Sequence, residues 1–467
     1  MAVFRYDPNR RHFLRSMVAG SVLMPGIVSE LMGKEVSNPL APRRAHFAPK
    51  AKRVIFMNMS GGVSHVDTFD HKPQLYRDHG REIDKSDHPE IQNRPGYEKI
   101  FLKKPQWKFK PHSQCGKEVS ELFPEVARSV DDVCFISSMH TGHSNHYNAT
   151  LGMHTGSFTV TRPSIGAWVS YGLGTVNQNL PSFVVIAPQS PYAGGQVWGS
   201  DLLPGAHQGT RVVPGATPVP NITPLVARNL QEFELAELRK RNQRHLDSQQ
   251  SNTELATRMR AFETAFGMQM AVPETFNLGQ ESDATHKLYG LERGQTNGFG
   301  WQCLAARRMA ERGVRFVELI HTGSSGNWDS HGDMMDHARL ARQVDRPIHG
   351  LLTDLKLRGM LDDTLVVWTT EFGRTPFNNS ADAKGREHHN WAFTTFLAGA
   401  GVRGGHTHGA TDEHGLRSVV DPVHTHDFHA TILHLLGLNH QRLTYFHDGR
   451  DFRLTDVAGS VVQGILA

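Results

Sequence analysis

The sequence predicts an α/β protein built on a large, mostly parallel central sheet with helices on both faces. Short apolar runs of strand length alternate with segments of helical spacing along most of the chain, a pattern typical of parallel sheets. The runs are apolar at nearly every position, which indicates strands buried on both faces. At 467 residues, 38% of them hydrophobic, the chain is long enough to bury such a core.

The expected elements follow one another in chain order. Strands are predicted where apolar or β-branched residues run without interruption, and helices where apolar residues recur every three or four positions. The predicted strands are residues 54–59, 133–139, 181–187, 314–320, 364–370 and 393–400. The predicted helices are residues 122–132, 145–154, 301–313, 351–363 and 426–438.

Two stretches depart from this alternation. Residues 71–116 are rich in Lys, Pro, Asp and His without periodicity, which indicates a surface excursion. From about 224 to 275, apolar residues recur at helical spacing among many charges. We expect this second stretch to be a helical insertion into a single domain that covers residues 42–467.

The bulk composition excludes some classes of partner. Lys and Arg total 50 against 46 Asp and Glu, and the net charge of +4 is too small to favour nucleic acid. The three cysteines, Cys115, Cys134 and Cys303, are widely spaced, so neither a disulfide framework nor a zinc ribbon is expected. The 29 histidines are the unusual feature, because imidazole is a common metal ligand.

The N-terminus has the anatomy of an export signal. Arg10 and Arg11 precede an apolar run from Ser16 to Val28, which is shorter than the ~20 residues that span a bilayer. The arginine pair resembles a Tat-type signal, which the Tat export machinery reads. Residues 1–41 are therefore interpreted as a signal and linker. A periplasmic or extracellular location is expected, with membrane tethering if the signal is not cleaved.

Acidic, basic and imidazole side chains follow four of the predicted strands. Because parallel strands place their carboxyl ends at one edge of a sheet, these groups are expected to meet there. Mixed carboxylate and imidazole ligands suit zinc or manganese, and all-oxygen sets suit magnesium or calcium. One or two divalent ions are therefore predicted. The candidate ligands are His65, Asp67, Asp329, His331, Glu371 and His388.

Five motifs carry a resemblance to a known family. They are MSGGVSHVDTFDHKP, RPSIGAWVSYGLGT, GNWDSHGD, TTEFGRTP and GREHHNWAFTTFLAGAGVRGG. Together they resemble the bacterial family called domain of unknown function 1501, whose members are similar to the alkaline phosphatase and sulfatase superfamily. The resemblance implies an alkaline phosphatase-like fold, one or two metal ions, and a hydroxyl or modified Cys nucleophile at a helix N-terminus. It also implies hydrolysis or transfer of phosphate or sulfate esters.

The resemblance assigns roles to particular residues. Asp329 and His331 match a metal-binding Asp/His pair, and His388 matches a late histidine ligand. Glu371 stands where the superfamily commonly has an Asp-His dipeptide. After the first strand the superfamily has a metal-binding Asp where this chain has Met59-Ser60-Gly61, so His65 and Asp67 are the candidate substitutes.

Residues 138–156 read SMHTGHSNHYNATLGMHTG and contain the candidate nucleophile. Ser144 is predicted to cap the helix 145–154, where the positive end of the helix dipole stabilises an anion. His143 or His146 would activate it, and Thr141 and His146 compete with it as the nucleophile. Arg374 and Arg386 are candidates for binding an anionic substrate, or else pair with nearby acids.

The sequence thus favours an exported, metal-dependent hydrolase of phosphate or sulfate esters, acting on a small-molecule or glycan ester. The competing hypothesis is a metal-stabilised binding module that keeps the fold without the chemistry. The absent Asp after the first strand and the absent Asp-His dipeptide favour this second hypothesis. The sequence predicts neither the metal's identity nor the oligomeric state.

Overall fold

The computed structural model of the chain describes residues 38–84, 97–248 and 253–467. The export signal predicted for residues 1–41 lies almost entirely outside these ranges. Among the described helices, none combines the length and the apolar character needed to cross a membrane.

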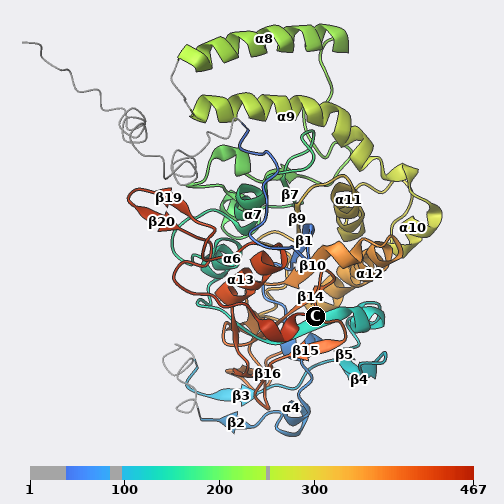
Figure 1. The fold of residues 1–467 in the computed structure, drawn as a ribbon. Helices are drawn as coiled ribbons and strands as arrows, with labels where there is room; N and C mark the ends of the chain where they lie inside the picture. The colour runs from blue at the N-terminus through green and yellow to red at the C-terminus, as the bar shows by residue number, and fades with distance from the viewer. Residues whose placement is uncertain (1–37, 85–96, 249–252) are drawn as a thin grey trace, which may run out of the picture.

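A nine-stranded central sheet has the order β15-β6-β14-β10-β1-β9-β7-β8, with β18 also paired to β6 (Figure 1). Strand β14 runs antiparallel to both of its neighbours, and the other pairs are parallel. The predicted large, mostly parallel sheet is therefore confirmed. The strands are β1 (Arg53–Asn58), β6 (Val133–His140), β7 (Phe183–Ile186), β8 (Thr210–Val212), β9 (Phe316–Ile320), β10 (Thr364–Thr369), β14 (Phe393–Ala398), β15 (His406–His408) and β18 (Val423–His424).

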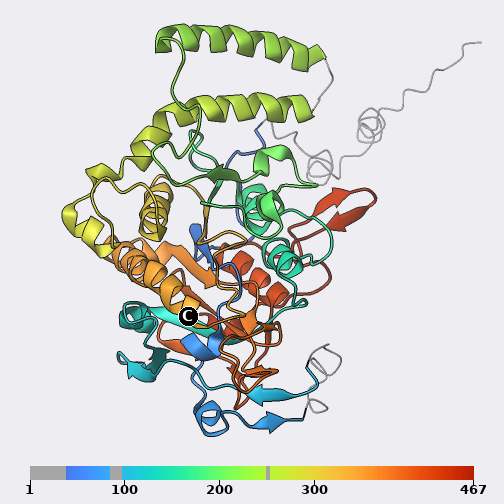
Figure 2. The same cartoon turned by 180° about the vertical axis from the view of Figure 1, so that it is seen from behind.

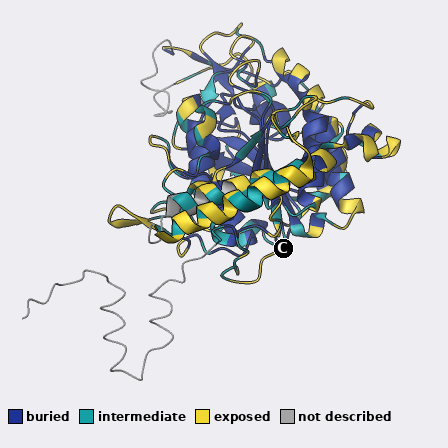
Figure 3. Cartoon of the chain, turned by 90° about the horizontal axis from the view of Figure 1, so that it is seen from above, coloured by how far each residue is buried: buried dark blue, intermediate teal, exposed yellow. Residues whose placement is uncertain are grey.

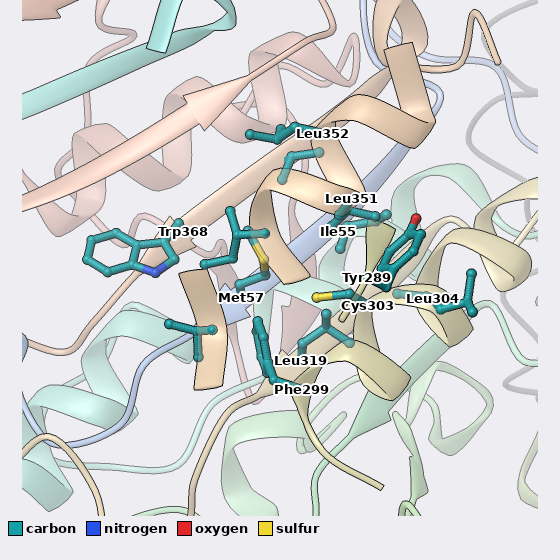
Figure 4. Close-up of a cluster of buried hydrophobic side chains, with 14 of the residues drawn as sticks. Ile55, Met57, Tyr289, Phe299, Cys303, Leu304, Leu319, Leu351, Leu352 and Trp368 are labelled. Carbon is teal, nitrogen blue, oxygen red and sulfur yellow. The ribbon is translucent and has the colours of Figure 1, made fainter. Parts of the chain in front are cut away.

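Helices cover both faces of this sheet (Figures 1 and 2). Alternate residues of β1 enter opposite cores: Ile55 and Met57 join one, and Val54 and Phe56 join the other. The first core, part of which Figure 4 shows, is closed by α11 (Phe299–Glu311) and α12 (Met335–Leu357). The second is closed by α6 (His146–Thr155), α7 (Ile165–Leu173) and α13 (Thr425–Leu435). Burial on both sides explains why the strands are apolar throughout.

Some elements differ from the sequence-based expectation. Residues 126–132 form a 3₁₀ helix, and Pro124 lies just before it. Helix α12 begins at Met335, well before the expected residue 351. The excursion at 71–116 carries a short helix and paired strands, namely α4 (Pro73–Arg77), β2 (Glu82–Ile83), β3 (Ile100–Leu102) and β4 (Phe109–His112), which pairs with β5 (Lys117–Ser120).

Two long helices, α8 (Arg228–Ser248) and α9 (Thr253–Phe276), occupy the stretch at 224–275. They lie outside the sheet layers, with α8 outermost (Figures 1 and 3). No residue of α8 is buried. The remaining short elements are α3 (His65–Thr68), α10 (Asp283–Leu288), β11 (Gly373–Arg374), β12 (Phe377–Asn378), β13 (His388–His389), β16 (Ala410–Thr411), β17 (Ser418–Val420), β19 (Tyr445–His447) and β20 (Arg450–Phe452).

Candidate metal centre

The direction of the strands brings the polar segments to one edge of the sheet. Strands β1, β6, β9 and β10 point the same way, so the segments that follow them meet at their shared carboxyl edge. Because β14 runs the opposite way, its amino end lies at that edge too, and His388 comes shortly before it. This edge therefore collects residues from five separate stretches of the chain.

Three side chains here are placed to hold one metal ion. His146, Asp329 and His388 each offer a ligand atom, and these atoms all lie within 4.8 Å of one another. His331 extends the group, because its Nε2 is 2.8 Å from Asp329 Oδ1 and 2.9 Å from His388 Nε2. His146 Nε2 lies 3.2 Å from Asp329 Oδ2, on the other side of the carboxylate.

Each imidazole is anchored through its other ring nitrogen. The anchoring acceptors are the Glu371 carboxylate for His146 (2.6 Å), the Glu387 carboxylate for His331 (3.0 Å) and the Ser144 carbonyl for His388 (2.7 Å). Because these oxygens only accept, each Nδ1 carries a proton. In a neutral ring the Nε2 lone pair then points toward Asp329. This arrangement, with a carbonyl or carboxylate behind each imidazole, is the usual environment of metal-binding histidines.

When no ion is bound, a protonated histidine balances the negative charge of Asp329. Burial opposes ionisation of Asp329, but hydrogen bonds from the three histidines hold the pKa of its carboxyl far below the usual range. The hydrogen bonds to Asp329 and Glu387 raise the pKa of His331 to about 9, whereas burial lowers that of His388. His331 is thus an imidazolium near neutral pH, and a divalent cation would replace its Nε2 proton.

Glu371 lies behind His146 and orients it. Its carboxylate is fully buried and accepts hydrogen bonds from the Gly61 amide (2.8 Å) and the Thr370 hydroxyl (3.1 Å). Burial would raise the pKa of Glu371, but His146 and backbone amides, including that of Gly61, keep it below its usual value. The residue predicted as a metal ligand therefore contacts the cluster through His146.

Arg374 is not available to a substrate. Its guanidinium is fully buried and donates to the carbonyls of Gly61, Gly62 and Arg386 and to the carboxylate of Asp329. Of the two alternatives for Arg374, these contacts correspond to pairing with a nearby acid, Asp329. Arg374 thereby positions Asp329 at the end of the loop that follows β9.

Three other predicted site residues make their contacts in a second buried region, away from Asp329. Arg386 donates to Asp67 (2.7 Å) and to three backbone carbonyls, so it does not face a substrate. Both oxygens of Asp67 accept from protein donors, which include the Ser64 hydroxyl at 2.5 Å. His65 Nε2 lies 2.8 Å from the Gly415 carbonyl, and its ring stacks on His389. His65 and Asp67 are thus not ligands alongside Asp329.

The histidine-rich segment lies beside the cluster, with the helix shifted by one residue. Asn145, not Ser144, is the N-cap of α6: its side chain accepts from the Tyr147 amide, which makes His146 the first helical residue. Ser144 is exposed, and its carbonyl anchors His388. The Nδ1 of His143 accepts from the Asn145 amide at 3.0 Å.

Two residues near the cluster were not among the predicted site residues. Glu387 anchors His331, and the Tyr192 ring stacks on His146 with centroids 4.3 Å apart. The Tyr192 hydroxyl in turn accepts from Asn327, in the loop that carries Asp329. Glu387 adjoins a predicted ligand in GREHHNW, which is the signal that could have indicated it. Tyr192 follows a strand other than those with polar clusters, so no comparable signal marks it.

Comparisons with known proteins agree with the motifs. The model of a family described as "Protein of unknown function (DUF1501)" matches residues 51–466. No curated protein matches this chain. Solved structures similar to the chain include the lipoteichoic acid synthase LtaP from Listeria monocytogenes, at 10% identity and a TM-score of 0.35, covering 92% of this chain and 79% of LtaP.

Two further solved structures are similar at the same level. A TAB5 alkaline phosphatase mutant with Mg bound in its M3 site has 11% identity and a TM-score of 0.37, covering 85% of this chain and 100% of that one. The PsFucS1 sulfatase from Pseudoalteromonas sp. has 12% identity and a TM-score of 0.35, covering 98% of this chain and 78% of that one. At these TM-scores, the chemistry of those proteins is not transferred to this chain.

Proposed function

We propose that this chain, which belongs to the DUF1501 family of proteins of unknown function, is an exported hydrolase of phosphate or sulfate esters that depends on one divalent metal ion. One observation carries the proposal: three imidazoles, each anchored from behind, converge on the carboxylate of Asp329. The sequence allowed one or two ions. One is favoured because His65 and Asp67 are engaged elsewhere.

The donor set fits a transition metal better than a hard cation. His146, His331 and His388 offer nitrogen, and Asp329 offers oxygen. Imidazole with carboxylate suits zinc or manganese, whereas calcium and magnesium prefer oxygen alone. When bound, the ion would supply positive charge to polarise an ester oxygen.

The chain's own residues supply the remaining parts of an ester-cleaving site. Ser144 offers an exposed hydroxyl just before Asn145, the N-cap of α6, and its carbonyl binds His388 of the cluster. The first turn of α6 has no acidic residue, so its helix dipole favours an anionic group nearby. We assign Ser144 as the attacking group. Hydrogen bonds to Asp329 and Glu387 raise the pKa of His331 to about 9, so His331 is an imidazolium at neutral pH.

A binding module without catalysis is the second candidate, and one observation favours it. Arg374 and Arg386 are the arginines expected to hold the anion, but both donate their guanidinium hydrogens to protein acceptors. A site without a free arginine stabilises the transferring group less. The same metal centre would then stabilise the fold or bind an anion.

Turnover under defined metals separates the two candidates. Chelator-treated protein, reloaded with zinc or manganese, is assayed on aryl phosphates and aryl sulfates. An active protein loses turnover in Asp329→Asn, while Asp336→Asn keeps it because Asp336 is an exposed carboxylate on α12. Absence of turnover under every metal, with the ion still bound, would favour the binding module. Unchanged turnover in Ser144→Ala would remove only the nucleophile assignment.

Export is proposed from the N-terminal arginine pair, for which Tat-dependent transport is the test. The chain fused to a reporter should reach the periplasm in cells with a working Tat system and stay inside cells without one. Replacing Arg10 and Arg11 by Lys should block transport in cells with a working Tat system. Transport that persists in cells without a Tat system would contradict this part of the proposal.

A further inference from the structure

Helix α8 is a long helix with little cover from the rest of the described chain. It runs for 21 residues without a buried side chain and lies beside α9, away from the sheet (Figures 1 and 3). One side of it faces α9: Leu235, Leu238 and Asn242 line a narrow groove with Met259 and Phe262. In proteins most helical stability comes from the packing of an amphipathic face rather than from intrinsic propensity. A second packing partner is therefore expected.

A stripe of residues along α8 points away from α9. Leu230, Glu234, Glu237, Arg241 and Arg244 follow the alternating spacing of four and three that places residues on one helix face. At 3.6 residues per turn, this stripe lies ~130° around the helix axis from the side that faces α9. Exposed apolar side chains adjoin its start, with Leu230 at 47% and Phe233 at 65% exposure.

The charges on this stripe are ordered. Two acids, Glu234 and Glu237, come first, and two bases, Arg241 and Arg244, follow. Arg239 itself points toward α9, where it pairs with Glu263. If two α8 helices cross antiparallel about a two-fold axis that meets the stripe midway between Glu237 and Arg241, Glu237 faces Arg241 of the other copy and Glu234 faces Arg244. The symmetry repeats each pair, so four ion pairs form. A parallel arrangement would instead place like charges together.

We propose that a second copy of this chain docks antiparallel on α8, so that the two α8–α9 hairpins form a four-helix interface. The stripe is self-complementary under a two-fold axis, as an isologous dimer interface requires. An anionic membrane surface fits less well, because the stripe carries acids as well as bases. The inference does not depend on the proposed hydrolase activity, since α8 lies apart from the metal centre.

Charge reversal followed by mixing tests the pairing. In sedimentation velocity at low salt, the purified chain should dimerise. Glu234→Arg with Glu237→Arg makes the stripe wholly basic, and Arg241→Glu with Arg244→Glu makes it wholly acidic. Each double variant should weaken self-association by about tenfold or more, since like charges then face each other. An equimolar mixture of the two should regain a dimer that contains one copy of each.

The four-residue swap, which combines both double variants, is the matched control. It restores complementarity with the same residues altered, so it should dimerise as the unaltered chain does. Circular dichroism checks that the helix content is unchanged in every variant. An unaltered chain that stays monomeric, or double variants that dimerise as well as the unaltered chain, would overturn the proposal. Binding of the chain to anionic vesicles that is lost in the acidic variant, without any dimer, would do the same.

Discussion

At the scale of single residues, the proposed metal centre depends on groups that would not touch the ion. Sequence spacing predicted that Asp329, His331 and His388 meet at one edge of the sheet, and the three side chains do lie together. His146 was predicted as an activating base, yet it joins the cluster. Its role depends on Glu371, which is distant in sequence and holds its Nδ1. Pairings of this kind follow from tertiary packing, which spacing along the chain does not encode.

Glu371→Gln tests this indirect role. The amide keeps the size of the carboxylate, but it cannot accept from both His146 and the Gly61 amide with full charge. Loss of such a partner typically weakens metal binding about 10- to 100-fold. Competition with a chromophoric chelator measures the affinity for zinc, and Glu413→Gln, at an exposed position, serves as the control. Equal affinities in the two variants would show that Glu371 does not orient His146.

The pH dependence of metal binding tests the role of His331. Its folded-state pKa of about 9 lies above the ordinary value of 6.5, so the metal-free protein holds this proton at pH 7. The associated stability is fully present below pH 6.5 and is lost as pH rises toward 9. Metal must displace the proton, so its apparent affinity should increase from pH 7 to 9. In His331→Gln this pH-dependent increase should shrink, and an unchanged slope would contradict the assignment.

At the scale of elements, apolar runs located the strands, but not the direction of β14 or the start of α6. A strand buried on both faces is apolar in either direction, so residues 393–398 do not reveal an antiparallel neighbour. Helix α6 begins one residue later than predicted, because Ser144 and Asn145 are both good caps. His146 is therefore the first residue of α6, and from there its side chain reaches the cluster.

Gly61 shows how the end of β1 supports the site without a metal-binding Asp. It has φ +113°, and an added Cβ would lie 2.6 Å from the Trp328 amide nitrogen and 2.7 Å from that of Asp329. Gly61→Ala should therefore displace the Asp329 loop, abolish metal binding and destabilise the fold by more than the ~1–2 kcal/mol of left-handed strain. Gly80→Ala, with φ +80° and open space, should show only the strain. Chemical denaturation and metal content measure both variants, and equal losses would contradict the account.

At the scale of the whole molecule, the large number of histidines has a consequence for acid stability. Burial holds several imidazoles neutral. It lowers the pKa of His207, His321 and His424 to about 4, and that of His337 and His429 to about 3. The unfolded chain binds protons at these sites near pH 6.5, whereas the folded chain does not. Folding stability should therefore decrease as pH falls from about 6.5 to about 4.

Urea unfolding of metal-free protein at pH 7 and pH 5 measures this effect. Asp345 opposes it in part, because burial raises the pKa of its carboxyl to about 6, so its protonation favours the folded state. His146, His154 and His331 also oppose it, because their carboxylate partners raise their pKa values. More histidines have a lowered pKa than a raised one, so the unfolding midpoint should still be lower at pH 5. His207→Gln should reduce the difference, because it removes one of the titrating groups. A midpoint that is unchanged or higher at pH 5 would contradict the prediction.

The central claim is that one divalent ion binds at Asp329, between His146, His331 and His388. The most direct measurement is metal content by mass spectrometry, after loading with zinc or manganese and removing excess ion. We expect one ion per chain in the unaltered protein and none in Asp329→Asn, with both proteins folded. Retention of the ion by Asp329→Asn, or no bound ion in the unaltered protein under either metal, would contradict it.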